Sequence, residues 1–371
     1  MQIQNRLAEM RHKRGISATA LAKQVDVRRQ TIYAIEAGTY IPNTLVSLRL
    51  AHVLDVKVED LFCFDEKPSA PQTVRDVELL SSDESLQPGQ PVRLCRVGKR
   101  MLGVPSRPLP VTLPLADGVY IKASGAQRAT VHSFEAEDDS SKRLLIAGCD
   151  PAVSILGRFV AKEADIELIA AICCSLQAIK WLKDGKVHIA GSHLIDQKTG
   201  ESNVPIVKKL LPDGGYKIIT FAQWEQGLVV AKGNPKEIRE VADLSRKNVK
   251  LVNREKGSGS RFLLDEMLDK GGIEAPRVLG YNQIALGHIP AAWHIYSGQA
   301  DCCMATRAAA RTFGLDFIPL KTERYDFILR DRFFELRPVQ VLLDVLNRSA
   351  FQRELEALGN YDMTQTGRVL V

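Results

Sequence analysis

The sequence predicts a multidomain protein with an all-α head, a β-rich linker segment and a two-lobed α/β rear domain. Three observations predict this fold class. The chain has 371 residues, which is more than one compact hydrophobic core accommodates. Short helical patterns with a concentration of positive charge fill its front, and strand–helix alternation fills its rear. The predicted boundaries are 1–66, 67–141 and 142–371.

Composition is that of a folded protein, with 45% hydrophobic and 25% charged residues, which excludes a disordered or collagen-like chain. No apolar run reaches the roughly 18 residues that a membrane helix needs. The polar N-terminus lacks the features of a secretory signal, so we expect a cytoplasmic protein. The adjacent pairs Cys173-Cys174 and Cys302-Cys303 lie in apolar runs, which favours reduced, buried thiols.

The head combines positive charge with closely spaced short helices. Residues 1–50 carry eight Lys or Arg and only three acidic residues. Ser17 is placed to N-cap a helix over 18–24, and Asp26 sits at a tight turn that needs a positive φ. A second short helix follows over 28–37. Two short helices joined in this way form a helix-turn-helix, whose second helix fits the major groove of DNA.

A family resemblance supports this interpretation. The motif consists of Leu21-Ala22, Val27, Gln30-Thr31-Ile32, Ile35-Glu36, Gly38, Pro42 and Val58-Glu59-Asp60-Leu61-Phe62. Over residues 5–64 it resembles the phage-repressor (Cro/C1, or XRE) type of DNA-binding domain. The resemblance implies that operator bases are read by the start of the second helix, through Arg28, Arg29, Gln30, Thr31 and Tyr33. Ala18 replaces the usual Gln and Arg28 the usual capping Ser, so the operator sequence stays open.

The middle of the chain is less informative. Residues 65–92 are rich in Pro, Ser and acidic residues, which is typical of a linker. Short β-like stretches punctuated by Gly and Pro follow over 88–140 and predict a small β-rich subdomain. Such a subdomain would orient the DNA-binding heads or hold a dimer together, and the sequence does not choose between these roles.

From residue 142 the chain alternates strands and helices in two successive series, which predicts two α/β lobes with a cleft between them. Asp150 is expected to N-cap a helix that has Pro151 at its first position. Helix N-termini that face a cleft bind anions through their unpaired N–H groups. The segment Gly257–Arg261 is the best local case, although a plain strand–helix connection is as good an explanation.

This half also resembles a known family. The motifs are Ala190–Leu194, Asp196, Thr199–Glu201, Asn203, Asn253-Arg254, Gly257–Gly259, Arg261, Leu264-Asp265, Ser297-Gly298, Ala300-Asp301, Gly314–Leu320, Glu323, Tyr325-Asp326 and Leu358–Asp362. They look like the cytoplasmic periplasmic-binding-protein-like domain related to molybdate-binding proteins, over residues 142–371. The resemblance implies a small oxyanion such as molybdate or tungstate as the first ligand to test, although one scaffold holds diverse ligands.

The candidate ligand-binding residues are Asp150, Ser192, His193, Ser258, Gly259, Ser260, Arg261, Asp301 and Tyr325. Most have a structural alternative: His193 as a satisfied core residue, Asp150 and Ser192 as caps or turn residues, Asp301 as a loop brace. Tyr325 is expected to line the hinge. The cysteine pairs lack a CxxC spacing or a nearby His, so no metal ligand and no cofactor are predicted.

These observations favour a one-component transcriptional regulator that binds operator DNA and senses a small anionic solute. We expect a homodimer or higher homo-oligomer, whose heads fit half-sites about 34 Å apart. The alternative is an enzyme or carrier acting on an anion, with the DNA-binding module attached. His193, Asp196, Glu201 and Asp301 have no recognisable catalytic spacing, so no catalytic residue is predicted. A third option is a purely structural scaffold whose pocket is degenerate and binds no ligand.

Overall fold

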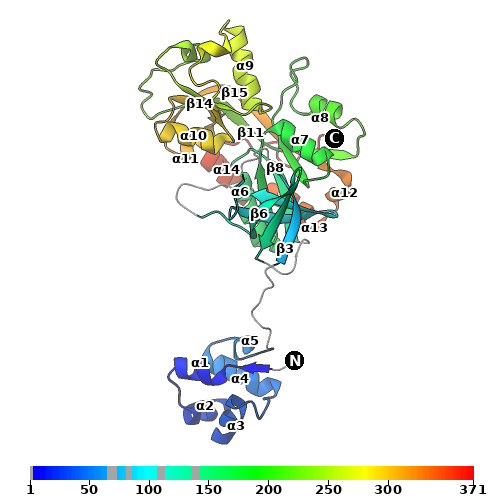
Figure 1. Ribbon diagram of the computed structural model, residues 1–371, viewed down its shortest axis with the longest axis vertical. Coiled ribbons are helices and arrows are strands. Elements are labelled where there is room, and N and C mark those ends of the chain that lie inside the picture. Colours follow the sequence, from blue (N-terminus) through cyan, green and yellow to red (C-terminus); the bar gives the residue numbers. More distant parts are fainter. Residues whose placement is uncertain (1–2, 65–72, 81–85, 107–112, 135–141) are drawn as a thin grey trace. The chain divides into compact units, whose positions relative to one another are not determined.

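The computed structural model describes residues 3–64, 73–80, 86–106, 113–134 and 142–371. The chain divides into two compact units, Met1–Pro71 and Gln72–Val371. Figure 1 labels many of the helices and strands in both units. Much of the predicted linker lies outside the described residues, and each unit is treated by itself below.

The front unit is a small helical domain closed by a two-stranded sheet. Its elements are β1 (Ile3–Asn5), α1 (Leu7–Lys13), α2 (Ala18–Val25), α3 (Arg29–Glu36), α4 (Thr44–Leu54), α5 (Val58–Leu61) and β2 (Phe62–Phe64). Ser17 accepts from the N–H of Ala20 and so caps α2, as expected. Asp26 ends α2 with φ 58°, which confirms the predicted tight turn. The buried core includes Leu21, Ile32 and Leu50, so α2, α3 and α4 are held together by apolar packing.

The predicted linker over 65–92 is wrong in part, because it contains a strand. Five strands form a closed barrel: β3 (Thr73–Leu79), β4 (Pro91–Val97), β5 (Arg100–Pro105), β6 (Gly118–Gly125) and β7 (Arg128–Ser133). β3 pairs with both β5 and β7. Val77 is buried in the barrel core, whereas Arg75, Asp76 and Glu78 on the same strand are charged. That acidic and basic content made β3 look like linker sequence.

The barrel packs directly on the rear domain. Its residues Cys95, Leu102 and Val104 share one apolar core with residues of the α/β sheet. A buried ionic network adds to this contact. Asp117 of the barrel pairs with Arg93 at 2.9 Å and with Arg143 of the rear sheet at 3.4 Å. Because apolar contacts and ion pairs both cross the boundary, the barrel and the rear domain form one compact unit.

The rear domain is built on an eight-stranded mixed sheet in the order β13-β12-β14-β11-β15-β10-β8-β9. Its strands are β8 (Arg143–Gly148), β9 (Glu167–Ile172), β10 (Ile189–Ser192), β11 (Tyr216–Val230), β12 (Leu251–Arg254), β13 (Ile284–Ala285), β14 (Cys302–Thr306) and β15 (Asp316–Arg330). The strand–helix series expected from residue 142 is therefore present. It ends with the long return strand β15.

Helices cover the sheet and pack in apolar clusters against it. They are α6 (Val153–Ala164), α7 (Ser175–Lys183), α8 (Val204–Leu210), α9 (Gly259–Lys270), α10 (His288–Tyr296), α11 (Arg307–Thr312), α12 (Asp331–Phe334), α13 (Arg337–Leu346) and α14 (Ser349–Gly359). The expected start of the first helix at Pro151 is wrong, because α6 begins at Val153 with Ala152 as its N-cap. Asp150 instead accepts from the N–H of Ala152 and forms a turn before the helix.

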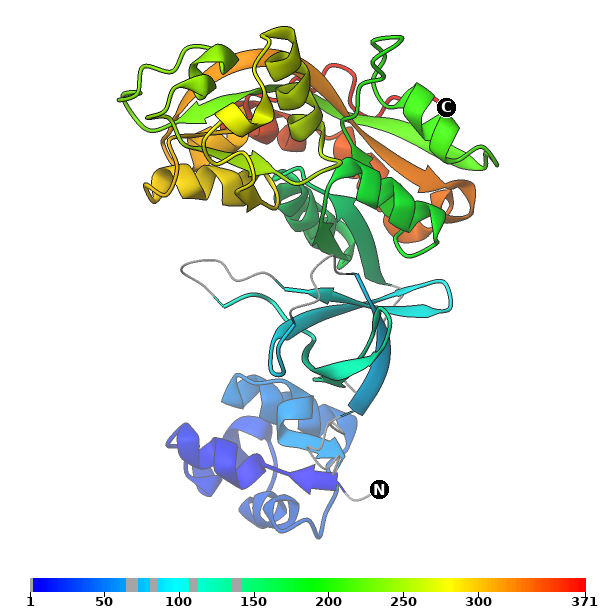
Figure 2. The same ribbon diagram turned by 45° about the horizontal axis from the view of Figure 1, so that its top comes forward.

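Two long antiparallel strands join the lobes. β11 and β15 have fifteen residues each and pair from Tyr216↔Arg330 to Val230↔Asp316. Figure 2 shows them as the long green and orange arrows that run through both halves of the sheet. β8, β9 and β10 lie on one side of this pair and define the first lobe, whereas β12, β13 and β14 lie on the other and define the second. The parallel strands of both lobes therefore end near the middle of β11 and β15.

His188, the residue immediately before β10, couples the stability of this domain to pH. Its Nδ1 accepts from the N–H of Leu145 at 3.0 Å, and its ring packs edge-on against Phe333. Burial, with a smaller contribution from Arg332, lowers the pKa of His188 from 6.5 to about 4. The neutral ring is therefore favoured by folding, and this contribution is complete above pH 6.5 and is lost as the pH falls toward 4.

Acidification should therefore destabilise the rear domain through His188. We expect roughly 3 kcal/mol of unfolding free energy to be lost between pH 6.5 and pH 4 from this group alone. Urea unfolding of the full chain at a series of pH values measures the loss. The control is His188→Asn, whose amide oxygen still accepts from the N–H of Leu145 but does not titrate. Parallel stability curves for the two proteins would show that His188 is not the sensitive group.

Candidate functional site

The exposed start of α3 forms the first candidate site. Arg28, Arg29, Gln30 and Tyr33 line an open pocket of about 520 Å³, and Thr31 beside them is half-buried. Arg29 donates to the hydroxyl of Tyr33 at 2.9 Å, and its guanidinium lies 5.2 Å from the ring centroid of Tyr33. The structure thus brings all five predicted DNA-contacting residues to one surface of the front unit.

Buried residues below this surface fix its orientation. Ile32 and Ile35 on the opposite face of α3 are fully buried. Glu36 at the end of α3 pairs with Arg11 of α1 at 2.6 Å and so ties the two helices together. Arg28 precedes α3 without a side-chain capping bond, so its guanidinium is not committed to the helix end. The arrangement presents donors that suit base edges and phosphates.

The second candidate site is a cluster of polar and aromatic side chains between the two lobes. We call it the central cluster. It consists of Cys149, His193, Trp224, Arg254, His288, Glu323 and Tyr325. Each of these side chains is buried. Cys149 follows β8 and His193 follows β10, while Arg254 ends β12 and His288 begins α10. The cluster therefore gathers the carboxyl ends of parallel strands from both lobes, where α/β sheets bind ligands.

Short contacts connect these side chains. The sulfur of Cys149 lies 3.5 Å from Nε2 of His193 and 3.6 Å from Nε2 of His288. Nδ1 of His193 lies 2.7 Å from a carboxylate oxygen of Glu323. Arg254 donates to Nδ1 of His288 at 2.9 Å, and its other nitrogens pair with both oxygens of Glu255. The cluster is thus a continuous polar network that crosses from one lobe to the other.

Close neighbours perturb the protonation of the two imidazoles in opposite directions. Burial lowers the pKa of His193, but Cys149 and Glu323 outweigh it and raise that pKa to about 10. Burial, Arg254 and His193 together lower the pKa of His288 well below its ordinary value. At neutral pH the cluster therefore holds one charged and one neutral imidazole beside the charged guanidinium of Arg254.

Two buried polar atoms in this region have no hydrogen-bond partner among the described residues. They are Nε1 of Trp224 and Oδ2 of Asp150. The ring of Trp224 lies 5.0 Å from that of His193 and 5.2 Å from that of His288. Asp150 uses its other oxygen to accept from Tyr361 at 2.9 Å, and burial raises its pKa to about 6. Unpartnered buried groups are costly in a finished fold, so they point to a site that takes a ligand.

Four of the nine predicted ligand-binding residues meet at or beside the central cluster: Asp150, His193, Gly259 and Tyr325. The hydroxyl of Tyr325 accepts from the N–H of Cys149. A side chain on Gly259 would lie 2.5 Å from the ring of His193, so this glycine permits the close approach of α9. Asp150 adjoins Cys149 at the end of β8.

The other five predicted residues have partners elsewhere in the fold. Ser192 donates to Asn203, Ser258 caps α9, and Ser260 accepts from Gln226 at 2.6 Å. Arg261 pairs with Asp265 and stacks on Tyr281. Asp301 accepts from the N–H of Lys250 and so braces a loop, one of the two roles considered for it. Their part in ligand binding stays a prediction.

The predicted site residues did not include Cys149, Trp224, Arg254 or His288. Cys149 lay next to the expected cap Asp150, and its position directly after a strand was the available signal. Arg254 likewise ends a strand. His288 and Trp224 carry no local signal, because only the packing of one lobe against the other places them beside Cys149 and His193.

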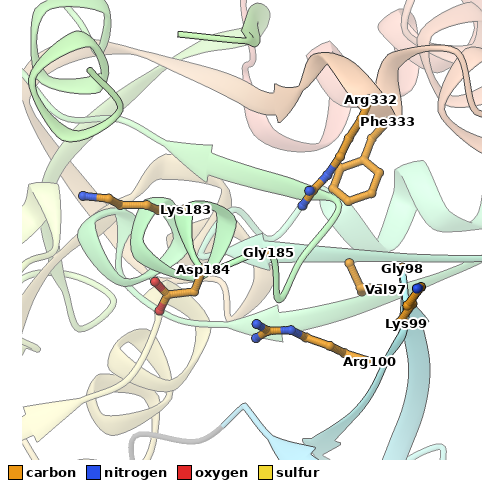
Figure 3. Close-up of a pocket in the computed structure, with 9 residues that line it drawn as sticks. All are labelled: Val97, Gly98, Lys99, Arg100, Lys183, Asp184, Gly185, Arg332 and Phe333. Atoms are coloured by element: carbon orange, nitrogen blue, oxygen red, sulfur yellow. The ribbon is translucent and has the colours of Figure 1, made fainter. Parts of the chain in front are cut away.

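A third candidate is an open pocket of about 440 Å³ between the barrel and the first lobe. Figure 3 shows the side chains that line it. Lys99 comes from the β4–β5 turn and Arg100 begins β5. Lys183 ends α7, and Arg332 and Phe333 belong to α12. Arg100 is partly neutralised by Glu78 at 3.4 Å, and Arg332 lies over the ring of Phe333. The pocket is basic but its charged side chains are exposed to solvent, so we assign it no ligand.

Comparison with known proteins supports the assignments made for the front and rear domains. Residues 157–347 match the family described as PBP superfamily domain, which is about half of the chain, and residues 7–61 match a helix-turn-helix family. None of the helices in the described part of the chain is long and apolar enough to cross a bilayer.

Several relatives and solved structures are similar to parts of the chain. The uncharacterised protein YvgK of Bacillus subtilis is 34% identical over 246 residues, 66% of this chain and 79% of YvgK. An uncharacterised HTH-type transcriptional regulator of Archaeoglobus fulgidus is 40% identical over 65 residues, 18% of this chain and 93% of its own length. The sulfate-binding protein SubI of Mycobacterium tuberculosis aligns with 59% of this chain and 86% of its own at 16% identity and TM-score 0.44, a score too low to inform on the ligand.

The family matches agree with the geometry described above. A helix-turn-helix presents its exposed recognition surface in the front unit, and two α/β lobes enclose a polar cluster in the rear. The chain therefore belongs to the PBP superfamily and carries an XRE-type helix-turn-helix domain at its N-terminus, which makes it a helix-turn-helix regulator with a PBP-like ligand-binding domain.

Proposed function

We propose that this protein is a cytoplasmic one-component transcriptional regulator that senses a small anionic solute between its lobes. The solute class is a tetrahedral oxyanion, with molybdate or tungstate as the first ligand to test. Arg28, Arg29, Gln30, Thr31 and Tyr33 contact the operator. The observation that carries the proposal is the burial of Arg254 and of His193, which lies 2.7 Å from Glu323, in the central cluster.

The chemistry of the central cluster suits an anion. Arg254 offers charge-assisted donors, and the unpartnered Nε1–H of Trp224 is a further donor in the same region. α9 and α10 both begin beside the cluster, at Gly259 and His288, and helix N-termini add favourable potential for negative charge. Glu255 holds the guanidinium of Arg254 in place, and Glu323 holds the ring of His193.

The two-lobed arrangement supplies a mechanism for the response. The donors come from both lobes, so a bound solute stabilises the closed arrangement more than an open one. Such differential affinity is the condition for a ligand to shift a conformational equilibrium. In a homodimer, closure would alter the spacing of two recognition helices relative to half-sites about 34 Å apart. The proposal divides the chain into a DNA-binding head (1–66), a connecting segment (67–141) and a solute-binding domain (142–371).

The alternative of an enzyme or carrier is less well supported. Asp196 and Glu201, two of the acid–base candidates, lie in a turn in which Asp196 accepts from Lys198 and Thr199. Asp301 braces a loop, so of the four candidates only His193 faces the central cluster. We therefore propose that the domain senses its solute without converting it. Recovery of a chemically altered solute after incubation with the protein would favour the alternative.

The experiment measures solute binding and operator binding on the full chain. An operator is first selected from random duplexes, and its affinity is then measured with molybdate, tungstate, sulfate or phosphate added. We expect molybdate or tungstate to raise the thermal unfolding midpoint and to change operator affinity at least about tenfold. If no oxyanion alters either quantity, the proposed solute class is wrong.

A further inference from the structure

Three side chains of the central cluster have the types and positions of metal ligands. They are Cys149, His193 and His288, and their ligand atoms all lie within 4.8 Å of one another. Cys149 is 6% exposed, and each histidine is 1% exposed. A thiolate with two imidazoles is a ligand set that borderline-soft transition metals prefer over Mg²⁺ or Ca²⁺.

The two distances from the sulfur of Cys149 agree with a common metal centre. Zinc bonds of roughly 2.3 Å to sulfur and 2.0–2.1 Å to nitrogen, at a tetrahedral angle, place sulfur and nitrogen about 3.6 Å apart. The observed separations from the sulfur of Cys149 are 3.5 Å to His193 and 3.6 Å to His288. We propose that Cys149, His193 and His288 bind one divalent transition-metal ion of the Zn²⁺ class between the lobes.

Surrounding groups support this site. Nδ1 of His193 lies 2.7 Å from Glu323, so Nδ1–H donates to the carboxylate, and a metal ion bound at Nε2 replaces the hydrogen that this nitrogen carries in the charged ring. Binding of a divalent ion displaces the thiol proton of Cys149, and the carboxylates of Glu323 and Glu255 supply negative charge in the same buried region.

Arg254 makes metal binding at His288 conditional. A guanidinium only donates, so Nδ1 of His288 accepts from Arg254 at 2.9 Å and the ring hydrogen sits on Nε2, facing Cys149. A metal ion takes the place of that hydrogen, which requires the hydrogen at Nδ1 and the contact with Arg254 to open. Arg254 keeps both oxygens of Glu255 when this happens.

The site joins the two lobes. Cys149 and His193 belong to the first lobe, and His288 begins α10 of the second. A metal ion held by all three fixes the lobes in the closed arrangement. Three protein ligands leave a fourth tetrahedral position for water or a small anion. This inference does not rest on the proposed solute, because metal binding is measurable without any oxyanion present.

The test uses the full-length protein freed of metal by a chelator. Zn²⁺ affinity is measured by competition with a chromophoric chelator, and Co²⁺ is added as a spectroscopic substitute. We expect one ion per chain and a sulfur-to-cobalt charge-transfer band in the near ultraviolet. Cys149→Ser should abolish that band and weaken Zn²⁺ binding at least about 100-fold. Glu323→Gln should weaken it about 10- to 100-fold.

Two further variants distinguish loss of a metal ligand from a general effect of substitution. Cys174→Ser is the matched control, because Cys174 is the N-cap of α7, where Ser is well tolerated, and lies outside the ligand set. It should bind Zn²⁺ like the unaltered protein. Arg254→Gln should bind Zn²⁺ more tightly, since Gln offers an oxygen to Nδ1–H of His288, whereas the same variant should lose its oxyanion response. Co²⁺ bound without the charge-transfer band, or Zn²⁺ affinity unchanged in Cys149→Ser, would overturn the proposed site.

Discussion

Replacing Arg254 by Gln is expected to weaken oxyanion binding about 100-fold or more. The guanidinium is fully buried and provides the strongest donors of the central cluster. Truncating one partner of a buried, hydrogen-bonded charge pair costs about 2–5 kcal/mol of binding free energy, and each 1.4 kcal/mol is a factor of about ten. Thermal unfolding of the full chain with increasing molybdate or tungstate measures the loss.

The control for this variant is Glu255→Gln. Arg254 and Glu255 form one buried ion pair, with nitrogen–oxygen distances of 2.9 and 3.1 Å. Breaking it from either side should cost about 3 kcal/mol of unfolding free energy, so both variants are expected to be less stable. Only Arg254→Gln should also lose protection by the solute. If the two variants lose protection equally, Arg254 acts on the fold and not on the solute.

The front unit was predictable because its structure is determined locally. Ser17 and Asp26 lie at positions where capping and positive φ select particular residue types, and both behave as predicted. The buried positions Ile32 and Ile35 repeat at helical spacing, which fixes the exposed face of α3. The surface proposed to read DNA is thus encoded within one short stretch of chain.

The central cluster was predictable only in part, because it depends on contacts between distant segments. His193 and Tyr325 were identified from strand ends and family motifs, and they do lie in the cluster. His288 reaches Cys149 across 139 positions of sequence, and no local pattern encodes that contact. The ion pairs of single side chains were not predicted either. Arg261 has the residue type of an anion-binding site, but it pairs with Asp265 four positions along α9.

The middle of the chain illustrates a second limit. Its β content was predicted, yet β3 was assigned to the linker because it lies in a stretch rich in Pro, Ser and acidic residues and itself carries three charged side chains. In a small closed barrel only one face of each strand is buried, so half of the strand reads as surface sequence. The position of the barrel against the first lobe depends on the buried contacts of Arg93, Asp117 and Arg143, which are far apart in sequence.

Simultaneous replacement of Arg29 and Gln30 by Ala should abolish specific operator binding. Both side chains are exposed on the recognition surface, and each direct base contact contributes about 1–3 kcal/mol of discrimination. The loss for the double variant is therefore about 100-fold or more for the selected operator. Binding to random duplex should fall far less, because only one positive charge is removed. Fluorescence anisotropy with both duplexes measures the two affinities.

Lys13→Gln is the matched control for the charge. Lys13 is exposed on α1 and pairs with Glu9 at 2.7 Å, so its replacement also removes one positive charge but leaves the recognition surface intact. It should lower affinity for operator and random duplex by the same small factor. Stability is expected to be unchanged in both proteins, since the buried positions Ile32 and Ile35 keep their packing. If the Arg29–Gln30 variant lost affinity equally for both duplexes, these residues would contact phosphates and the bases would be read elsewhere on the head.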